Sequence, residues 1–223
     1  MAKPIVLLQH GWGFSRQIWN DWVEELELEY EVLTTNRGYF SNSDSDIDIN
    51  QKMKADFAIV HSFGLHLLPM NLFSRLKKLV IISGFQEFHP PSGNERAISE
   101  KVVLRMLQVL DKQPAEVLRE FYRNCFYPVA KDVVVPQNLN KSTLFDDLAL
   151  LNKFSMNLKL LKPIPKVLML HGKNDKIVPP SLGELLHNKL PQSSFHACEN
   201  GGHMILSTHQ DWCMGYISEF FES

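Results

Sequence analysis

Short apolar runs alternate along the chain with longer segments in which apolar residues recur every three or four positions. A short continuous apolar run is typical of a strand buried on both faces, whereas the longer spacing predicts an amphipathic helix. Strands that alternate with helices imply parallel crossovers. We therefore predict an α/β fold with a mostly parallel sheet, whose strands cover residues 4–9, 31–35, 56–61, 78–83, 166–171 and 194–198.

Helices are predicted between and after these strands. Residues 15–28 carry apolar side chains at helical spacing, and Ser15 is placed to cap the helix. The helix after residue 63 is expected to be short because Pro69 interrupts it, and a last helix begins at Met204. The polar, acidic residues 41–50 are interpreted as a surface loop.

A long segment without a convincing strand separates the fourth and fifth predicted strands. Three amphipathic stripes lie in it, over residues 94–110, 114–125 and 143–151. A helical insertion at the carboxyl edge of a sheet would overhang a site there. We therefore expect one compact core, formed by residues 1–87 and 160–223, with helices on both faces of its sheet and a helical cap inserted at residues 88–159.

Composition narrows the class of protein. The chain has 223 residues, 44% of them apolar and 22% charged, with a net charge of −2, so a nucleic-acid partner has no support. No apolar run approaches the length of a membrane span, and the N-terminal stretch is too short for a signal peptide, so a cytoplasmic protein is expected. Cys125, Cys198 and Cys213 lie far apart, which predicts reduced thiols rather than a disulfide framework or zinc site. No cofactor or metal is expected.

Ser62 is the first candidate for chemistry. Residues 58–64 read Ala-Ile-Val-His-Ser-Phe-Gly, which is typical of a buried strand that turns sharply into a helix with the serine at the bend. The nucleophile-elbow motif G-x-S-x-G is matched only in its second half, because Val60 stands where the first glycine belongs. On its own this segment fits a serine that caps a helix equally well.

Three other turns would supply the oxyanion donor, the base and the orienting carboxylate that a serine nucleophile needs. Trp12 follows the first strand in His-Gly-Trp-Gly, and its backbone N–H and that of Phe63 are the expected oxyanion donors. Asp175 lies in a turn after the fifth strand, and His203 follows two glycines after the sixth. The chain order serine, aspartate, histidine is that of an α/β-hydrolase triad. Taken singly, these turns also fit an ordinary strand-to-helix turn, an aspartate that shapes a turn and a surface histidine.

Three further histidines lie near these turns in sequence. His61 faces away from Ser62 if the strand alternates normally. His66 follows Ser62 in the next helix, where its side chain would contact substrate. His171 ends a strand and is interpreted as structural.

The motifs resemble those of the α/β-hydrolase superfamily over nearly the whole chain. They are the residues at 10–13, 61–64, 172–179 and 202–203. Within it, Gly-Trp-Gly, the compact core and the helical cap resemble the pimeloyl-[acyl-carrier protein] methyl ester esterases of biotin synthesis. Residues 36–41 are similar to that family's Asp-x-x-Gly-x-Gly-x-Ser turn, with the second glycine missing.

The resemblance implies that the Trp12 amide serves the oxyanion hole and that cap arginines engage an acidic acyl-carrier protein. The candidates are Arg119 and Arg123, four residues apart and so on one helix face, with Arg105 and Lys131 as weaker choices. A solvated helix face is the alternative for these side chains.

The expected function is that of a serine carboxylesterase. Through a Ser62–His203–Asp175 acyl-enzyme mechanism it would hydrolyse the methyl ester of pimeloyl-[acyl-carrier protein] to the free acid and methanol. A short-chain carboxylesterase or another small-molecule α/β-hydrolase is the alternative among enzymes. A non-catalytic binding protein of this fold is the alternative outside them, favoured by Val60 at the elbow.

Overall fold

A computed structural model describes residues 2–40 and 54–223, and the predicted loop at 41–50 lies outside them. Six strands within the described residues form one parallel sheet in the order β2-β1-β3-β4-β5-β6. Each predicted strand is confirmed to within one residue at either end. The strands are β1 Ile5–Gln9, β2 Glu31–Thr34, β3 Phe57–His61, β4 Lys78–Ile82, β5 Lys166–Gly172 and β6 Ser193–Cys198.

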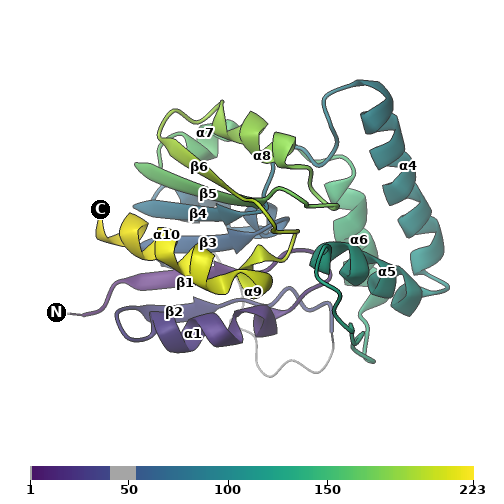
Figure 1. The fold of residues 1–223 in the computed structure, drawn as a ribbon, viewed down its shortest axis with the longest axis horizontal. Helices are drawn as coiled ribbons and strands as arrows, with labels where there is room; N and C mark the ends of the chain where they lie inside the picture. The colour runs from purple at the N-terminus through teal and green to yellow at the C-terminus, as the bar shows by residue number, and fades with distance from the viewer. Residues whose placement is uncertain (1, 41–53) are drawn as a thin grey trace.

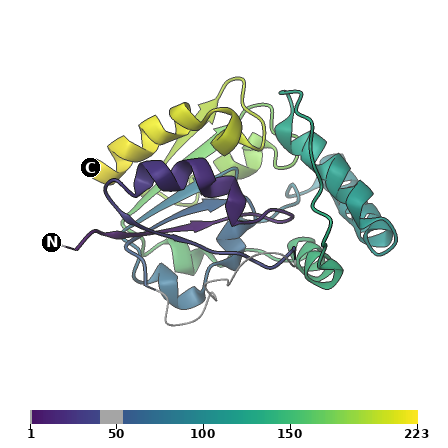
Figure 2. The ribbon, with the colours of Figure 1, turned by 90° about the horizontal axis from the view of Figure 1, so that it is seen from below.

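Helices cover both faces of this sheet (Figures 1 and 2). Alternate strand residues face opposite layers, as the pleat requires. Leu8 and Ile59 pack with helices α1 and α10, whereas Leu7 and Val60 pack with α2, α3, α7 and α8. The core helices and the 3-10 turn η1 are η1 Arg16–Trp19, α1 Asn20–Leu26, α2 Gly64–Leu67, α3 Met70–Phe73, α7 Leu158–Leu161, α8 Pro180–His187, α9 Ile205–Thr208 and α10 Gln210–Glu222.

The remaining helices lie beyond the carboxyl ends of the strands, at the right of Figure 1. They are α4 Gly93–Leu110, α5 Pro114–Phe126 and α6 Lys141–Leu151, in the segment where a helical insertion is predicted. One continuous apolar cluster includes residues of these helices and of the sheet. The exact division into a core and a cap at residues 88–159 stays a prediction, but the placement at this edge of the sheet puts α4–α6 beside the candidate site.

Local signals in the sequence explain several element ends. The Ser15 side chain accepts a hydrogen bond from the Gln17 backbone, so the predicted cap is confirmed, although the first turn is 3-10. Helix α2 stops at Leu67, ahead of Pro69 as predicted. Helices α3 and α7 have four residues each, which is too short for a periodic pattern to reveal them.

The three cysteines are free and buried, as expected for reduced thiols. In the part of the chain that the structure describes, no helix is long and apolar enough to cross a membrane.

Candidate active site

Ser62 lies at a sharp bend directly after β3. Its backbone φ is 54°, in the left-handed region that residues other than glycine adopt rarely and at a cost. The Ser62 N–H donates to the Ile82 carbonyl at 2.8 Å, which fixes the bend against β4. A Cβ on Gly64 would lie 2.7 Å from the Gln9 carbonyl oxygen, so only glycine fits there. The bend forms even with Val60 at the first motif position. The Val60 side chain is buried on the face of the sheet that α2 and α3 cover.

The turn after β1 lies against this bend. A Cβ on Gly11 would come within 3.0 Å of the Ser62 Cβ, which brings the peptide between Gly11 and Trp12 next to the serine. Among residues 2–40 and 54–223, neither the Trp12 nor the Phe63 backbone N–H has a hydrogen-bond partner. Two amide donors are therefore available beside the serine, which is the requirement for an oxyanion hole.

Asp175 and His203 form a buried hydrogen-bonded pair. The His203 Nδ1 donates to Asp175 Oδ2 at 2.7 Å. The other carboxylate oxygen, Oδ1, accepts the backbone N–H groups of Ile177 and Val178, each at 2.8 Å. Because Nδ1 carries the proton in this arrangement, the Nε2 atom of a neutral His203 has a free lone pair and can act as a base.

His171 adds a second imidazole to the same carboxylate. Its Nε2 donates to the Val178 carbonyl at 2.9 Å and lies 3.3 Å from Asp175 Oδ2. Burial by itself would raise the pKa of Asp175, but the charge of His203 and the hydrogen bonds from both histidines outweigh it and lower that pKa below the ordinary value. Asp175 is thus an anion that can stabilise an imidazolium at His203.

The structure does not join Ser62 to His203 by a hydrogen bond. The Nε2 atom of His203 is buried and has no hydrogen-bond partner within the described residues, and Ser62 as a whole residue is 6% exposed. Hydrogen bonds between a nucleophile and its base are often long without substrate and tighten when substrate binds.

The main chain of His203 is held by two side chains at the ends of β3 and β4. The hydroxyl of Ser83, which follows β4, donates to the His203 carbonyl at 3.0 Å, and His61 Nε2 donates to the same oxygen at 3.2 Å. The His61 and His203 rings are 4.7 Å apart between centroids. Ser83 has φ 51°, a second strained non-glycine backbone. Sequence reasoning gave neither Ser83 nor His61 a part in the site, because only the sharp turns after β3 and β4 bring them to the histidine.

Small residues let the histidine turn pack closely. A Cβ on Gly202 would lie 1.7 Å from the carbonyl oxygen of Tyr127, just after α5. A Cβ on Gly172 would lie 2.2 Å from the Gly202 carbonyl oxygen. The Met204 N–H donates to the Cys125 carbonyl at 3.1 Å, so the end of α5 is fixed on the turn that carries His203.

His66 lies in an aromatic environment beside the elbow. Its ring stacks on Phe63 at 5.3 Å between centroids, and the rings of Phe85 and Phe154 lie at 4.8 and 5.4 Å. Nε2 donates to the Phe85 carbonyl at 3.1 Å. Burial lowers the pKa of His66 to about 4, against the opposing effect of that hydrogen bond, so the ring is neutral at pH 7. A contact between His66 and substrate stays a prediction.

The candidate carrier-binding arginines lie on α5. Arg119 forms an ion pair with Glu116 one turn earlier, and Arg123 is exposed. Arg105 on α4 is exposed as well, and the Lys131 ammonium lies 4.6 Å from the centre of the Phe126 ring. Their role toward a carrier protein stays a prediction.

Comparisons with known proteins give relatives over the full length of the chain and solved structures of similar fold. No protein-family model matches the chain. Pimeloyl-[acyl-carrier protein] methyl ester esterases of Legionella pneumophila, strains Corby and Paris, are each 22% identical over 231 residues, covering 99% of this chain and 96% of the relative.

Solved structures of similar fold cover the whole chain. The esterase EaEST from Exiguobacterium antarcticum aligns with TM-score 0.81 at 16% identity, and a hydrolase from Oleispira antarctica with TM-score 0.77 at 17% identity. Both alignments cover 100% of this chain. They cover 93% of the Exiguobacterium esterase chain and 92% of the Oleispira hydrolase chain. The chain thus has the α/β-hydrolase fold and resembles, along its full length, the pimeloyl-[acyl-carrier protein] methyl ester esterases.

Proposed function

We propose that the protein is a serine carboxylesterase that works through Ser62, His203 and Asp175. The observation that carries the proposal is the buried 2.7 Å hydrogen bond from His203 to Asp175, on a turn anchored to His61, which precedes Ser62, and to Ser83, which follows the neighbouring strand β4. The arrangement fixes the tautomer of the base, and we propose that this base acts on the serine at the strained bend.

In the first half of the reaction, Ser62 Oγ attacks the ester carbonyl and His203 Nε2 takes the hydroxyl proton. The Trp12 and Phe63 amides donate to the oxyanion of the tetrahedral intermediate, and Asp175 stabilises the imidazolium. Collapse of the intermediate breaks the bond to the alkoxy group. His203 then protonates that group, which leaves as an alcohol.

In the second half, His203 takes a proton from water, and the hydroxide attacks the acyl-enzyme carbonyl. The same two amides hold the second oxyanion. Release of the acid returns the proton from His203 to Ser62 Oγ. No cofactor or metal takes part in these steps.

The substrate we propose is the methyl ester of pimeloyl-[acyl-carrier protein], hydrolysed to the free acid and methanol in biotin synthesis. The names of the full-length relatives support this substrate. An acidic carrier protein would contact the α5 face that carries Arg119 and Arg123, and His66 would contact the acyl chain. Of the aromatic rings around His66, those of Phe63 and Phe85 are buried, and the Phe154 ring, 38% exposed, offers the acyl chain an apolar surface.

The test compares two esters of very different size. The protein is incubated with pimeloyl-carrier methyl ester, with the free acid followed by mass spectrometry, and in parallel with p-nitrophenyl acetate. The proposal is supported if the parent protein hydrolyses both esters and Ser62→Ala hydrolyses neither. Hydrolysis of both at the parental rate by Ser62→Ala would sink the mechanism, and hydrolysis of only the small ester would sink the substrate.

A charge reversal tests the carrier surface. Arg119→Glu/Arg123→Glu should lower kcat/KM for the carrier-linked ester by about 10-fold and leave the small ester unchanged, because exposed charges act mainly on encounter with a charged partner. The matched control is Lys159→Glu/Lys162→Glu, at two exposed lysines in α7 and directly after it. Equal losses from both double variants would contradict the assignment to α5.

A further inference from the structure

The peptide unit that carries the Trp12 N–H also carries the Gly11 carbonyl. Because a peptide is planar and trans, the direction of that carbonyl fixes the direction of the N–H. The Gly11 oxygen is 2.8 Å from His10 Nδ1, and the Phe14 N–H makes a longer contact with it at 3.4 Å. A carbonyl only accepts, so His10 Nδ1 carries a proton and donates it.

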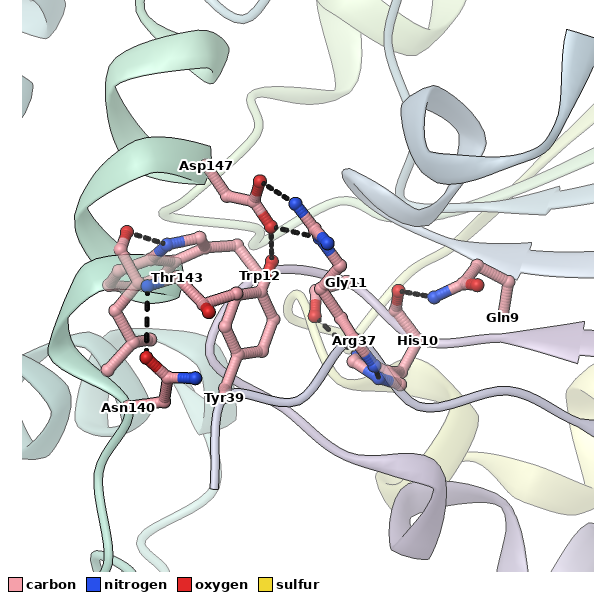
Figure 3. Close-up of polar contacts among 10 residues, drawn as sticks. Gln9, His10, Gly11, Trp12, Arg37, Tyr39, Asn140, Thr143 and Asp147 are labelled. Carbon is pink, nitrogen blue, oxygen red and sulfur yellow. Dashed lines mark hydrogen bonds and ion pairs between the residues drawn. The ribbon is translucent and has the colours of Figure 1, made fainter. Parts of the chain in front are cut away.

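The other ring nitrogen of His10 fixes this protonation state. The backbone N–H of Arg37, on the loop after β2, donates to His10 Nε2 at 3.0 Å, so Nε2 holds a lone pair. The two contacts together are compatible with only the neutral Nδ1–H tautomer of His10 (Figure 3). The ring is fully buried, and the Gln9 side chain holds the His10 carbonyl at 2.9 Å.

The Arg37 loop is in turn held by α6. Arg37 Nε and its terminal nitrogen donate to the two oxygens of Asp147 at 2.7 and 2.8 Å, and the Tyr39 hydroxyl donates to Asp147 Oδ2 at 2.7 Å. The Asp147 side chain is 2% exposed, so all three donors face a buried carboxylate. One turn earlier on α6, the Leu144 carbonyl accepts the Trp12 indole N–H at 2.9 Å (Figure 3).

We propose that His10 is a positioning residue that aims the Trp12 amide, and that the Asp147–Arg37 ion pair keeps His10 in the tautomer this requires. The proposal rests on the proposed function, because the Trp12 amide that His10 orients is an oxyanion donor only in the proposed esterase mechanism. Helix α6 then holds the oxyanion turn at two points, the Trp12 indole directly and the Gly11–Trp12 peptide through Arg37 and His10. Displacement of this peptide by a fraction of an ångström would weaken a contact made only in the transition state.

Two variants of similar shape distinguish the roles of the two ring nitrogens of His10. His10→Asn keeps an N–H donor near the Nδ1 position, whereas His10→Gln places an acceptor near Nε2 and loses the donor to Gly11. We expect His10→Gln to lower kcat for p-nitrophenyl acetate by about 10- to 100-fold with KM nearly unchanged, and His10→Asn to recover much of the loss. Rates are normalised to folded sites by titration with a fluorophosphonate. Equal kcat in His10→Gln and the parent would overturn the proposal.

The cap contribution is tested with Asp147→Asn, which removes the charge and keeps the side-chain shape. It should lower kcat by about 3- to 10-fold, and it should add nothing in a His10→Gln background, because both changes act on one peptide. The control is Glu100→Gln, which breaks the exposed Arg96–Glu100 pair on α4 and should leave kcat unchanged. Additive losses from Asp147→Asn and His10→Gln would overturn the link from the cap to His10.

A spectroscopic measurement on the parent protein does not depend on esterase activity. Long-range proton–nitrogen NMR of the imidazoles should show His10 protonated at Nδ1 and unprotonated at Nε2, and Asp147→Asn should shift both the His10 nitrogens and the Trp12 amide. A His10 protonated at Nε2 would overturn the inference even if the protein is an esterase. A protein without esterase activity that still shows the Nδ1–H tautomer and the coupled shifts would overturn the proposed function and leave the alignment of the peptide supported.

Discussion

The contact between Gly202 and the end of α5 makes Gly202→Ala a sharp perturbation. A Cβ there would lie 1.7 Å from the Tyr127 carbonyl oxygen and 2.9 Å from its carbon, both backbone atoms that no side-chain rotation can move away. The φ of Gly202 lies outside the left-handed region, so alanine meets no conformational penalty and the whole effect is steric.

The size of the effect follows from the distance. An ordinary carbon–oxygen contact is about 3.3–3.6 Å, so the turn and the end of α5 must separate by about 1.6–1.9 Å. Overpacking of this kind costs about 1–3 kcal/mol, which lowers Tm by roughly 2–4 °C per kcal/mol in a chain of this length. His203 is the next residue, and a displacement near 1 Å of a catalytic group can lower kcat by about 100-fold.

The assay is thermal unfolding by circular dichroism together with kcat for p-nitrophenyl acetate. Gly215→Ala is the matched control, because Gly215 is exposed within α10 and, beyond its chain neighbours and the backbone of its own helix, a Cβ added there would meet no atom of the described residues within 4 Å. Alanine there should raise stability by about 0.5–1 kcal/mol through helix propensity and leave kcat alone. A Gly202→Ala variant with parental Tm and kcat would refute the packing of α5 on the His203 turn.

Three other outcomes follow from the same contacts. Asp175→Asn should lower kcat by about 10⁴-fold while KM stays close to parental, measured on p-nitrophenyl acetate, because the amide no longer fixes the base tautomer. Ser83→Ala should lower kcat by about 3- to 10-fold with a loss near 1 kcal/mol in urea unfolding, since the His203 carbonyl loses one of two donors. Stability should fall as pH drops from about 6.5 to about 4: the folded pKa of His66, about 4, lies below its unfolded value, so the unfolded chain binds the extra proton. The His66 contribution to this loss is about 3 kcal/mol, and it is measured as the difference between the parent and His66→Phe in urea unfolding, because His61, whose pKa burial also lowers, contributes in both proteins.

Much of the fold could be predicted from local pattern. Each buried strand is a short apolar run next to a turn, so its ends are marked in the sequence, and Pro69 marks the end of α2. The turns with Ser62, Asp175 and His203 follow strands, and the carboxyl ends of parallel strands meet at one edge of a sheet. Their proximity was therefore predictable, although their catalytic roles stay predictions.

The supports of the site depend on contacts that no local pattern encodes. Asp147 reads as a polar position on an amphipathic helix, yet it is buried because Arg37, far away in sequence, pairs with it. His61 reads as the end of a strand, and Ser83 as the residue after one. Their shared acceptor, the His203 carbonyl, comes from a turn more than a hundred residues later. Long-range pairing of this kind becomes visible only when the sheet is assembled.

Covalent labelling of Ser62 tests the central claim most directly. The parent protein, Ser62→Ala and His203→Ala are treated with a fluorophosphonate, and the modified peptide is identified by mass spectrometry. The account predicts one adduct on Ser62, formed rapidly in the parent, absent in Ser62→Ala and at least about 100-fold slower in His203→Ala. An unlabelled Ser62 in the folded parent, or labelling at the same rate without His203, would contradict it.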